Sequence, residues 1–420
     1  MGGVSMEWKE VRLGDVCSEL SDGLHKAPKF IVNGEYIFVN AKNLYNGYIL
    51  DNDPTKKTSH EEYLKYKKPL GKHTILYSID GTIGNIAKYR GEKCVLGKGA
   101  CYINCNPEIV ESSYLYYQLQ SPHFKSYIHL MSTGSTIKHI SLKTMRDYVF
   151  ELPSLDDQRR IASILSSLDR KIELNNKINA DLEEMAQAIF KNWFVDFEPF
   201  KDGKLVDSEL GMIPEGWKVS QIADIPYILE TGKRPKGGAV EKGIPSVGAE
   251  HVKGMCAYDY SKNKYINCEF AAKLKTGKIN GYELMIYKDG GKPGYFIPNF
   301  SIFGEGYPFE NCYLNEHVFK LDFDGNKGFN IFCYFFFKTE QIMSYFNAQG
   351  AKAAIPGINK KDVENIYIFS PDNESVIKFG EFAYPLFKQM LKNAIENRTL
   401  STLRDTLLPR LMSGELEVPE

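Results

Sequence analysis

Several loops of this chain gather side chains that can bind phosphate groups and distinguish bases. They combine hydroxyl, amide and cationic groups with glycine or proline, as in Asp22–Lys29 and Ser132–His139. Lys, Ser and Thr suit phosphate oxygens, whereas Asn, Arg, Glu and His can read base edges. For any single residue, a solvated surface role is the alternative. The candidate contacts are His25, Lys26, Lys29, Asn40, Lys42, Asn43, Thr82, Ser135, Thr136, Lys138 and His139 in the first half, and Lys233, Arg234, Lys236, Glu250, His251, Lys292 and Lys352 in the second.

The sequence carries none of the common catalytic signatures. His60-Glu61-Glu62 lacks the second histidine of a zinc-protease helix, and neither Gly97-Lys98-Gly99 nor Gly290-Gly291-Lys292-Pro293 has phosphate-loop spacing. The eight cysteines show no zinc-site spacing, so we expect reduced cysteines in a cytoplasmic protein. No apolar run is long enough to cross a bilayer. We therefore predict a non-catalytic chain without metal ligands and without a bound cofactor.

The net charge of −1 conceals two basic stretches. Residues 231–281 hold ten basic and four acidic side chains, and residues 21–100 hold thirteen basic and eight acidic ones. The acidic residues gather elsewhere, in 154–190 and 201–230. A basic surplus in the corresponding part of each half is the footprint expected of phosphate contacts, although a solvated lysine-rich surface would look the same.

The candidate loops belong to two similar halves of the chain. An offset of 209 relates Trp8, Lys9, Leu13, Asp15 and Gly23 to Trp217, Lys218, Ile222, Asp224 and Gly232, and Asp80-Gly81 to Asp289-Gly290. Further along, the offset is 218, which relates Pro153 to Pro371 and Leu182 to Leu400. Apolar bursts at 36–39, 74–77 and 284–287 predict short strands, and 114–119 and 331–337 predict short helices packed on a sheet.

Each half ends in a heptad pattern, which predicts a long helix with one apolar seam. The first seam is Ile161, Leu165, Leu168, Ile172, Asn175, Asn179, Leu182, Ala186, Ile189 and Trp193. The second is Phe379, Ala383, Leu386, Met390, Asn393, Asn397, Leu400, Arg404, Leu407 and Leu411. Both seams carry two asparagines at their centre. Pro409 is expected to kink the second helix or end it early.

The two seams are expected to pair with each other, antiparallel about a pseudo-twofold axis, with Asn175 facing Asn397 and Asn179 facing Asn393. Packing against other subunits, or two ordinary core helices, are the alternatives. The fold class is therefore α+β, with two similar globular domains joined by two long helices. The predicted parts are a first domain (1–153), a first helix (154–196), a linker (197–216), a second domain (217–371), and a second helix with a C-terminal tail (372–420).

The chain ends are also expected to lie close together. Val418-Pro419-Glu420 repeats Ile213-Pro214-Glu215, the residues that lead into Trp217. By repetition, the C-terminal tail should lead back to Trp8 and the first domain.

At this point the chain resembles the specificity subunits of type I restriction-modification systems. The resemblance covers nearly all of it from Trp8 and rests on short motifs: Trp8-Lys-x-Val-x-Leu-Gly-Asp15, Asp22-Gly-x-His-Lys-x-Pro28, Leu152-Pro-x-Leu-x-x-Gln158-Arg-x-Ile-Ala162, Ile213-Pro-x-Gly-Trp217 and Leu411-Met-Ser-Gly-Glu-Leu416. The second repeat departs from it, because Pro371-Asp-Asn-Glu-Ser lacks the Gln-Arg-x-Ile-Ala of the first.

The resemblance implies two target-recognition domains, each reading one half of an asymmetric bipartite site on double-stranded DNA. The helices would set the gap and dock two modification subunits, which carry S-adenosylmethionine and the methyl transfer, and ATP-dependent restriction subunits would complete the nuclease. Three other classes of protein compete with this interpretation. A self-contained methyltransferase-nuclease would need catalytic motifs that are missing, a free-standing DNA- or RNA-binding protein would not need the long polar-centred helices, and a structural scaffold would not bind DNA.

Overall fold

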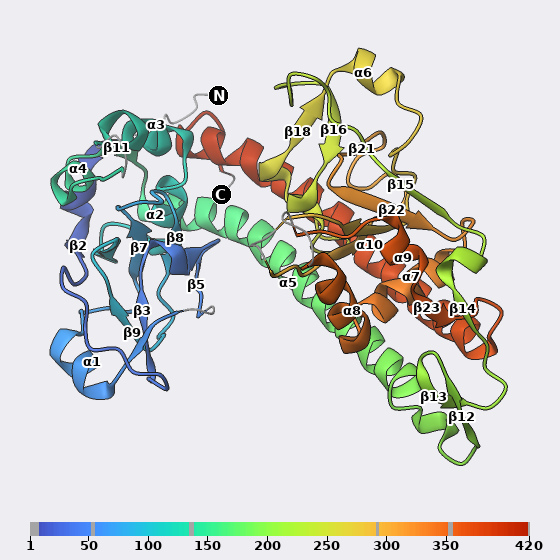
Figure 1. The fold of residues 1–420 in the computed structure, drawn as a ribbon. Coiled ribbons are helices and arrows are strands. Elements are labelled where there is room, and N and C mark those ends of the chain that lie inside the picture. Colours follow the sequence, from blue (N-terminus) through green and yellow to red (C-terminus); the bar gives the residue numbers. More distant parts are fainter. Residues whose placement is uncertain (1–7, 52–54, 134–137, 291–293, 352–355, 419–420) are drawn as a thin grey trace. The chain divides into compact units, whose positions relative to one another are not determined.

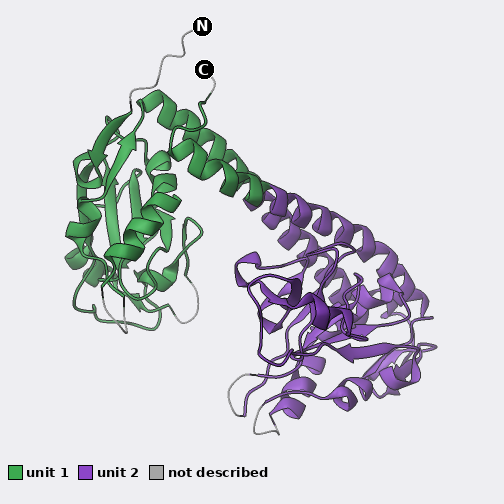
Figure 2. Cartoon of the chain, turned by 90° about the horizontal axis from the view of Figure 1, so that it is seen from above, with its two compact units in different colours: residues 1–171, 400–420 green, residues 172–399 purple. Residues whose placement is uncertain are grey.

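The computed structural model describes residues 8–51, 55–133, 138–290, 294–351 and 356–418. Two compact units divide the chain: unit 1 comprises 1–171 with 400–420, and unit 2 comprises 172–399 (Figure 2). The predicted α+β fold is confirmed, and each unit combines short sheets with helices (Figure 1). Two long helices, α5 (Leu155–Phe194) and α10 (Glu374–Met412), supply residues to both units.

Unit 1 is built on two small sheets. A four-stranded sheet has the order β2 (Cys17–Asp22), β10 (Ala100–Cys105), β7 (Thr74–Ser78), β8 (Ile86–Lys88). A three-stranded sheet has the order β6 (Lys57–Thr58), β3 (Tyr36–Val39), β9 (Cys94–Leu96), with β3 and β9 parallel. Strands β1 (Lys9–Arg12) and β11 (Val149–Leu152) pair, as do β4 (Leu44–Tyr45) and β5 (Tyr48–Ile49). The helices are α1 (His60–Tyr66), α2 (Ser112–Gln118), α3 (Pro122–Met131) and α4 (Leu142–Arg146).

Unit 2 repeats this plan with additions. Its main sheet has the order β15 (Ile228–Thr231), β22 (Val318–Asp322), β19 (Leu284–Tyr287), β20 (Phe300–Ile302), β17 (Gly254–Met255). Its second sheet is β18 (Lys264–Ile266), β16 (Ile244–Val247), β21 (Tyr313–Leu314), with β16 and β21 parallel. Strands β14 (Val219–Gln221) and β23 (Tyr367–Phe369) pair. The helices are α6 (Cys268–Ala272), α7 (Lys327–Phe337), α8 (Glu340–Gly350) and α9 (Lys360–Glu364).

The strands predicted at 36–39, 74–77 and 284–287 are present as β3, β7 and β19, and the two short helices as α2 and α7. The segment 197–216, predicted to be a linker, contains a β-hairpin of β12 (Leu205–Ser208) and β13 (Gly211–Pro214). Ile213 of this hairpin is buried in the core of unit 2, which explains why a polar segment still folds. Across the described residues, no helix combines the length and apolar character that crossing a membrane requires.

The central asparagines pair in the register that the sequence predicts. Within unit 2, Asn175 Nδ2 donates to Asn397 Oδ1 over 2.9 Å, and Asn393 Nδ2 donates to Asn179 Oδ1 over 2.8 Å. The earlier asparagine of α5 pairs with the later asparagine of α10 and the later with the earlier, so the helices run antiparallel here. Buried polar partners penalise any shift of register, because a shifted asparagine would lose its hydrogen bonds.

Two details of the predicted helices are wrong. Phe190 and Phe194 are buried more deeply than the seam residues Ile189 and Trp193, because the end of α5 also packs on the aromatic core of unit 2. Helix α10 continues past Pro409 to Met412, so Pro409 does not end the helix, and the alternative of a kink there stays a prediction. A proline this near the end of a helix removes only one of the last main-chain hydrogen bonds, so the final turn can still form.

Both described ends of the chain lie in the core of unit 1. Val418 is buried there, Trp8 packs against the same cluster, and the backbone at Gly414 lies against the Trp8 ring. The predicted proximity of the chain ends is therefore confirmed for the described residues.

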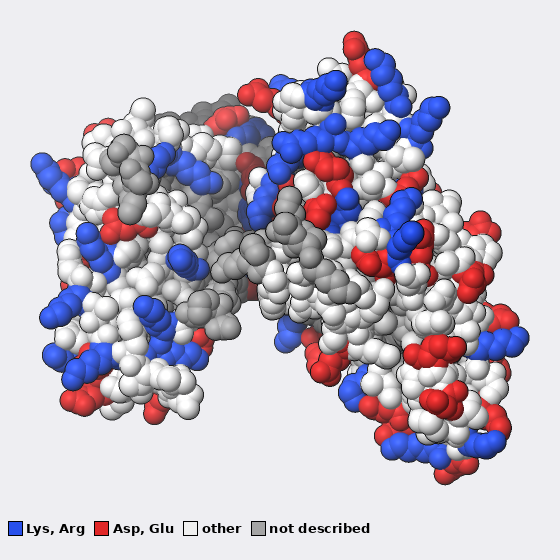
Figure 3. Space-filling view, in the orientation of Figure 1, with Lys and Arg blue, Asp and Glu red and all other residues white. Residues whose placement is uncertain are grey.

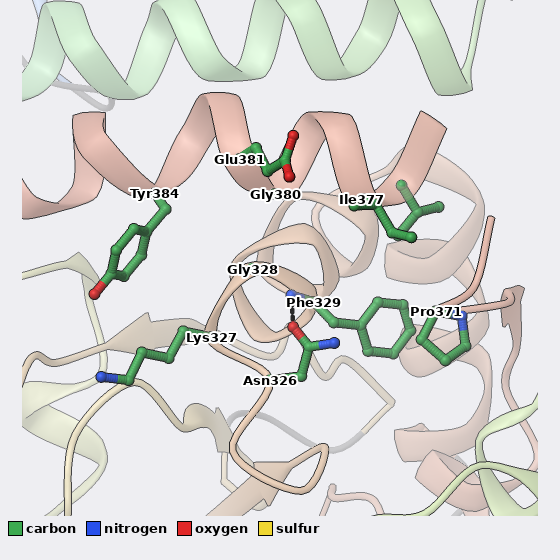
Figure 4. A pocket seen from close by; sticks show the side chains of 10 residues that line it. Asn326, Lys327, Gly328, Phe329, Pro371, Ile377, Gly380, Glu381 and Tyr384 are labelled. Carbon is green, nitrogen blue, oxygen red and sulfur yellow. Dashed lines mark hydrogen bonds between the residues drawn. The ribbon is translucent and has the colours of Figure 1, made fainter. Parts of the chain in front are cut away.

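The joint between the globular part and its long helix differs between the units. In unit 1, the fully buried Gln158 accepts from Glu111 N over 2.8 Å and donates to the carbonyl oxygens of Pro153 and Ile109 over 2.9 and 3.2 Å. In unit 2 the equivalent residue is Val376, and a pocket of 380 Å³ opens beside it, lined by Asn326, Lys327, Gly328, Phe329, Pro371, Ile377, Gly380, Glu381 and Tyr384 (Figure 4).

Candidate nucleic-acid interface

In unit 1, the loops predicted from sequence meet at Asp80-Gly81, the turn that follows β7. Gly81 N donates to Lys138 O over 3.0 Å, and His139 Nδ1 donates to a carboxylate oxygen of Asp80. Lys98 Nζ lies 3.8 Å from the other oxygen of Asp80. The loop carrying His25 is fixed to the same region, because Leu24 N donates to Leu96 O over 2.7 Å. Two separate loops, which carry His139 and Lys98, therefore place a basic side chain beside the Asp80 carboxylate.

Unit 2 builds the corresponding site at Asp289-Gly290, which follows β19. Gly290 N donates to Pro356 O over 2.8 Å, and His317 Nδ1 donates to Asp289 Oδ1 over 2.5 Å. Glu316 lies beside this pair, with Oε1 3.2 Å from His317 Nε2 and 3.7 Å from Arg234 Nη1. These residues border a pocket of 190 Å³ that Lys233, Lys264 and Asn315 also line.

Most of the predicted contact residues are available for binding. His25, Lys26, Lys29, Lys42, Thr82, Lys138, Lys233, Arg234 and Lys236 are exposed, and Asn40 and His139 are partly exposed. The Glu250 carboxylate is partly exposed and lies 2.6 Å from Lys264 Nζ, which lowers its pKa. Ser135, Thr136, Lys292 and Lys352 lie outside the described residues.

Two predicted contact residues, Asn43 and His251, are instead structural. Asn43 is 8% exposed and His251 is fully buried. Asn43 Oδ1 accepts from Asn40 N over 3.0 Å, and His251 Nδ1 accepts from Gly248 N over 3.2 Å, so both side chains close the same short helical turn. Burial is the main reason that the pKa of His251 is lowered. Neither side chain can reach a base in this structure, which corrects the sequence-based assignment.

The sequence reasoning missed Asp80, Lys98, Asp289, Glu316 and His317. A signal for the aspartates was present, because Asp-Gly recurs at the offset of 209 directly after an apolar strand in each half. His317 carried no such signal, since its partner Asp289 lies 28 residues away in the sequence.

The electrostatics of unit 2 agree with the charge count. Lys and Arg side chains group over the part of unit 2 that holds β16, β18 and β21, next to the pocket at Glu316 (Figure 3). Within the described parts of the chain, no cluster of three His, Cys, Asp or Glu side chains could hold a metal ion. Lys233, Arg234 and Lys264 line the pocket and provide positive charge and hydrogen-bond donors.

Comparison with known proteins gives a consistent result. Residues 6–184 match the family model described as the type I restriction modification DNA specificity domain. The type I restriction enzyme MjaIX specificity subunit of Methanocaldococcus jannaschii is 30% identical over 401 residues, which cover 94% of this chain and 86% of that protein. The HindI specificity subunit of Haemophilus influenzae is 26% identical, over 98% of this chain and all of that protein.

A solved structure also shares the fold. The crystal structure of the type I restriction-modification S subunit from M. genitalium aligns with a TM-score of 0.58 and 16% identity, covering 98% of this chain and 97% of that one.

Proposed function

The chain belongs to the specificity subunits of type I restriction-modification systems, and on this basis we propose that each of its units reads one half of a bipartite DNA site. The loops around Asp80 in unit 1 and around Asp289 in unit 2 are the proposed reading surfaces. The chain itself transfers no methyl group and cuts no DNA. S-adenosylmethionine is bound by the modification subunits, and restriction subunits complete the assembly.

One observation carries this proposal: the two sites share a backbone but differ in side chains. Ile79 N donates to Gly99 O over 3.0 Å in unit 1, and Lys288 N donates to His317 O over 3.1 Å in unit 2. The loops around these bonds nevertheless expose different donors and acceptors. Two sites with the same backbone arrangement but different exposed side chains suit a DNA target whose two halves differ in sequence.

The paired helices support the second part of the proposal, which is that they set the gap between the half-sites. The asparagine pairs fix the register of α5 against α10, so the separation along the helices cannot drift by a turn without losing buried hydrogen bonds. A fixed register is what a device that measures distance along DNA requires. The same helices dock the modification subunits.

The test is reconstitution. The purified chain with S-adenosylmethionine should methylate no DNA, whereas the chain mixed with its modification subunits should methylate one bipartite sequence. Mapping of methylated bases in a genomic DNA substrate measures both. Methyl transfer by the chain alone would overturn the proposal. Tight sequence-specific binding by the chain alone, unaffected by modification subunits, would favour a free-standing DNA-binding protein instead.

A further inference from the structure

Lys98 in unit 1 and Glu316 in unit 2 occupy equivalent places, and we propose that this place discriminates between bases in each half-site. The inference rests on the DNA-reading function proposed above. Lys98 would select a base that offers acceptors in the major groove, and Glu316 would select a base that offers an amino group.

Main-chain hydrogen bonds establish the equivalence on both sides of the position. Before it, Gly97 N donates to Val39 O over 2.8 Å, and Asn315 N donates to Val247 O over 3.0 Å. After it, Gly99 O accepts from Ile79 N and His317 O accepts from Lys288 N, and these donors directly follow β7 and β19. The single residue between these fixed points is Lys98 in one unit and Glu316 in the other.

An asparagine lies beside this position in both units, but it comes from a different loop in each. In unit 1, Asn40 lies against Gly97, where a Cβ would come within 2.3 Å of Asn40 Oδ1. In unit 2, the asparagine is on the other side: Asn315 lies against Gly248, where a Cβ would come within 2.7 Å of Asn315 Nδ2. In each unit an asparagine side chain packs against the glycine of the other loop. The backbone of the turn is therefore the same in both units although the side chains differ.

The histidine beside the aspartate is exchanged in the same way. His139 bonds Asp80, and its equivalent in unit 2 is Gly357; His317 bonds Asp289, and its equivalent in unit 1 is Gly99. Each unit therefore keeps one Asp–His pair at this place, recruited from different loops. The backbone of this site therefore accommodates different side chains around the position of Lys98 and Glu316. The two residues at that position carry opposite charges.

Glu316 offers acceptors only. Its side chain is 31% exposed, and His317 and Arg234 approach its Oε1 over 3.2 and 3.7 Å. A carboxylate accepts hydrogen bonds and cannot donate them, so the partner of its exposed part in the major groove is the amino group of cytosine or adenine.

Lys98 has the opposite capacity. It projects from the Gly97–Gly99 turn, about half of its side chain is exposed, and its ammonium lies 3.8 Å from Asp80. An ammonium can only donate, so its partners in the major groove are N7 of either purine, O6 of guanine and O4 of thymine, and guanine offers two of these acceptors side by side.

The test exchanges the two charges in the full complex. The chain is reconstituted with its modification subunits and selects from a library of randomised DNA duplexes, which are then sequenced. Glu316→Lys should shift the preference at one base pair of one half-site by about tenfold or more, from an amino-bearing base toward guanine or thymine, and leave the other half unchanged. Lys98→Glu should produce the reverse shift in the other half-site. Glu209→Lys, between β12 and β13, and Lys125→Glu, in α3, change exposed residues outside both sites, so they are the charge-matched controls and should keep both half-sites.

Selection of the unaltered site by both charge-exchanged variants would overturn the inference while leaving the proposed function intact. Should Glu316→Lys fail to fold or assemble, Glu316→Gln decides the matter, because it keeps the shape and one acceptor. A reduced preference at one base pair would support the inference, and an unchanged preference would reject it. A wild-type complex that selects no bipartite site would remove the proposed function, and the inference with it.

Discussion

The two joints between globular part and long helix show how far one repeat can depart from the other without losing the fold. In unit 1 the joint is polar, since Gln158 satisfies three main-chain groups from its buried position. In unit 2, Val376 and Gly380 replace Gln158 and Ala162, and the backbones of Gly328 and Gly380 approach closely. Main-chain bonding at the reading turns is retained, whereas side chains at the joints and reading positions have diverged.

The largest effect should come from exchanging a whole recognition region. Replacing residues 8–150 with the matching region of another specificity subunit should change one half-site completely and leave the other half and the gap intact, because each unit has its own core. Methylation mapping of the hybrid complex measures this. A change in both half-sites would show that the units do not read independently.

Lengthening the helices tests whether the paired lengths of α5 and α10 together set the gap between the half-sites. One heptad inserted into each helix adds about 10 Å at 1.5 Å per residue, which corresponds to roughly three base pairs. We expect a longer gap between unchanged half-sites in the methylated sequence. A heptad in only one helix should abolish activity, since the asparagine pairs would no longer meet; retained activity would contradict the register.

A buried lysine in unit 2 and a partly buried lysine in unit 1 provide a contrast in stability. Lys320 of unit 2 lies 2.8 Å from Glu230 and 3.7 Å from the buried Glu283. Lys320→Met should destabilise unit 2 by about 3–5 kcal/mol, because the buried Glu283 and the partly buried Glu230 lose the cation that balances their charge. In unit 1, Lys88 lies over the Tyr116 ring, and burial lowers its pKa to about 8.

Lys88→Met should therefore stabilise unit 1 at pH 7. A folded-state pKa below the unfolded value means that the unfolded state binds the proton more tightly, so wild-type stability rises as the pH goes from 8 toward 10.5. The advantage of the Met variant should fade over that interval in urea titrations at several pH values. An advantage independent of pH would assign the effect to packing alone.

The polar joint gives a smaller expected loss. Gln158→Val, which copies the joint of unit 2, should cost unit 1 about 2–4 kcal/mol, because the Pro153 and Ile109 carbonyls and the Glu111 amide lose their partner. Urea denaturation measures this. Val376→Gln is the reciprocal variant, and a cost below about 1 kcal/mol for Gln158→Val would show that water replaces the side chain.

The smallest effect is expected at a single reading residue. Arg234→Ala should relax or weaken only one half-site, by about 1–3 kcal/mol if Arg234 contacts a base. Competition binding of the complex to duplexes altered in either half measures it. An equal loss for all duplexes, with a shallower salt dependence, would mean that Arg234 holds phosphate.

Features that depend on the spacing of residues could be predicted from the sequence. The directions of side chains that depend on the local backbone could not. The asparagine register followed from a heptad period, which is one-dimensional information. Asn43 and His251 were assigned to DNA because their side chains suit bases, but a short helical turn directs them inward to a main-chain amide. The burial of Phe190 and Phe194 depended on a third packing partner that a two-helix seam does not contain.

The asparagine pairs also bear on how such a chain could arise. Asn175 and Asn179 lie symmetrically about the centre of their seam, and Asn393 and Asn397 about theirs, so the pattern is a palindrome of polar positions. A protein of one repeat could pair antiparallel with its own copy and match Asn175 with Asn179. That homodimer would read a symmetric site, and gene duplication with fusion would keep the pairing while freeing each half to acquire its own sequence preference.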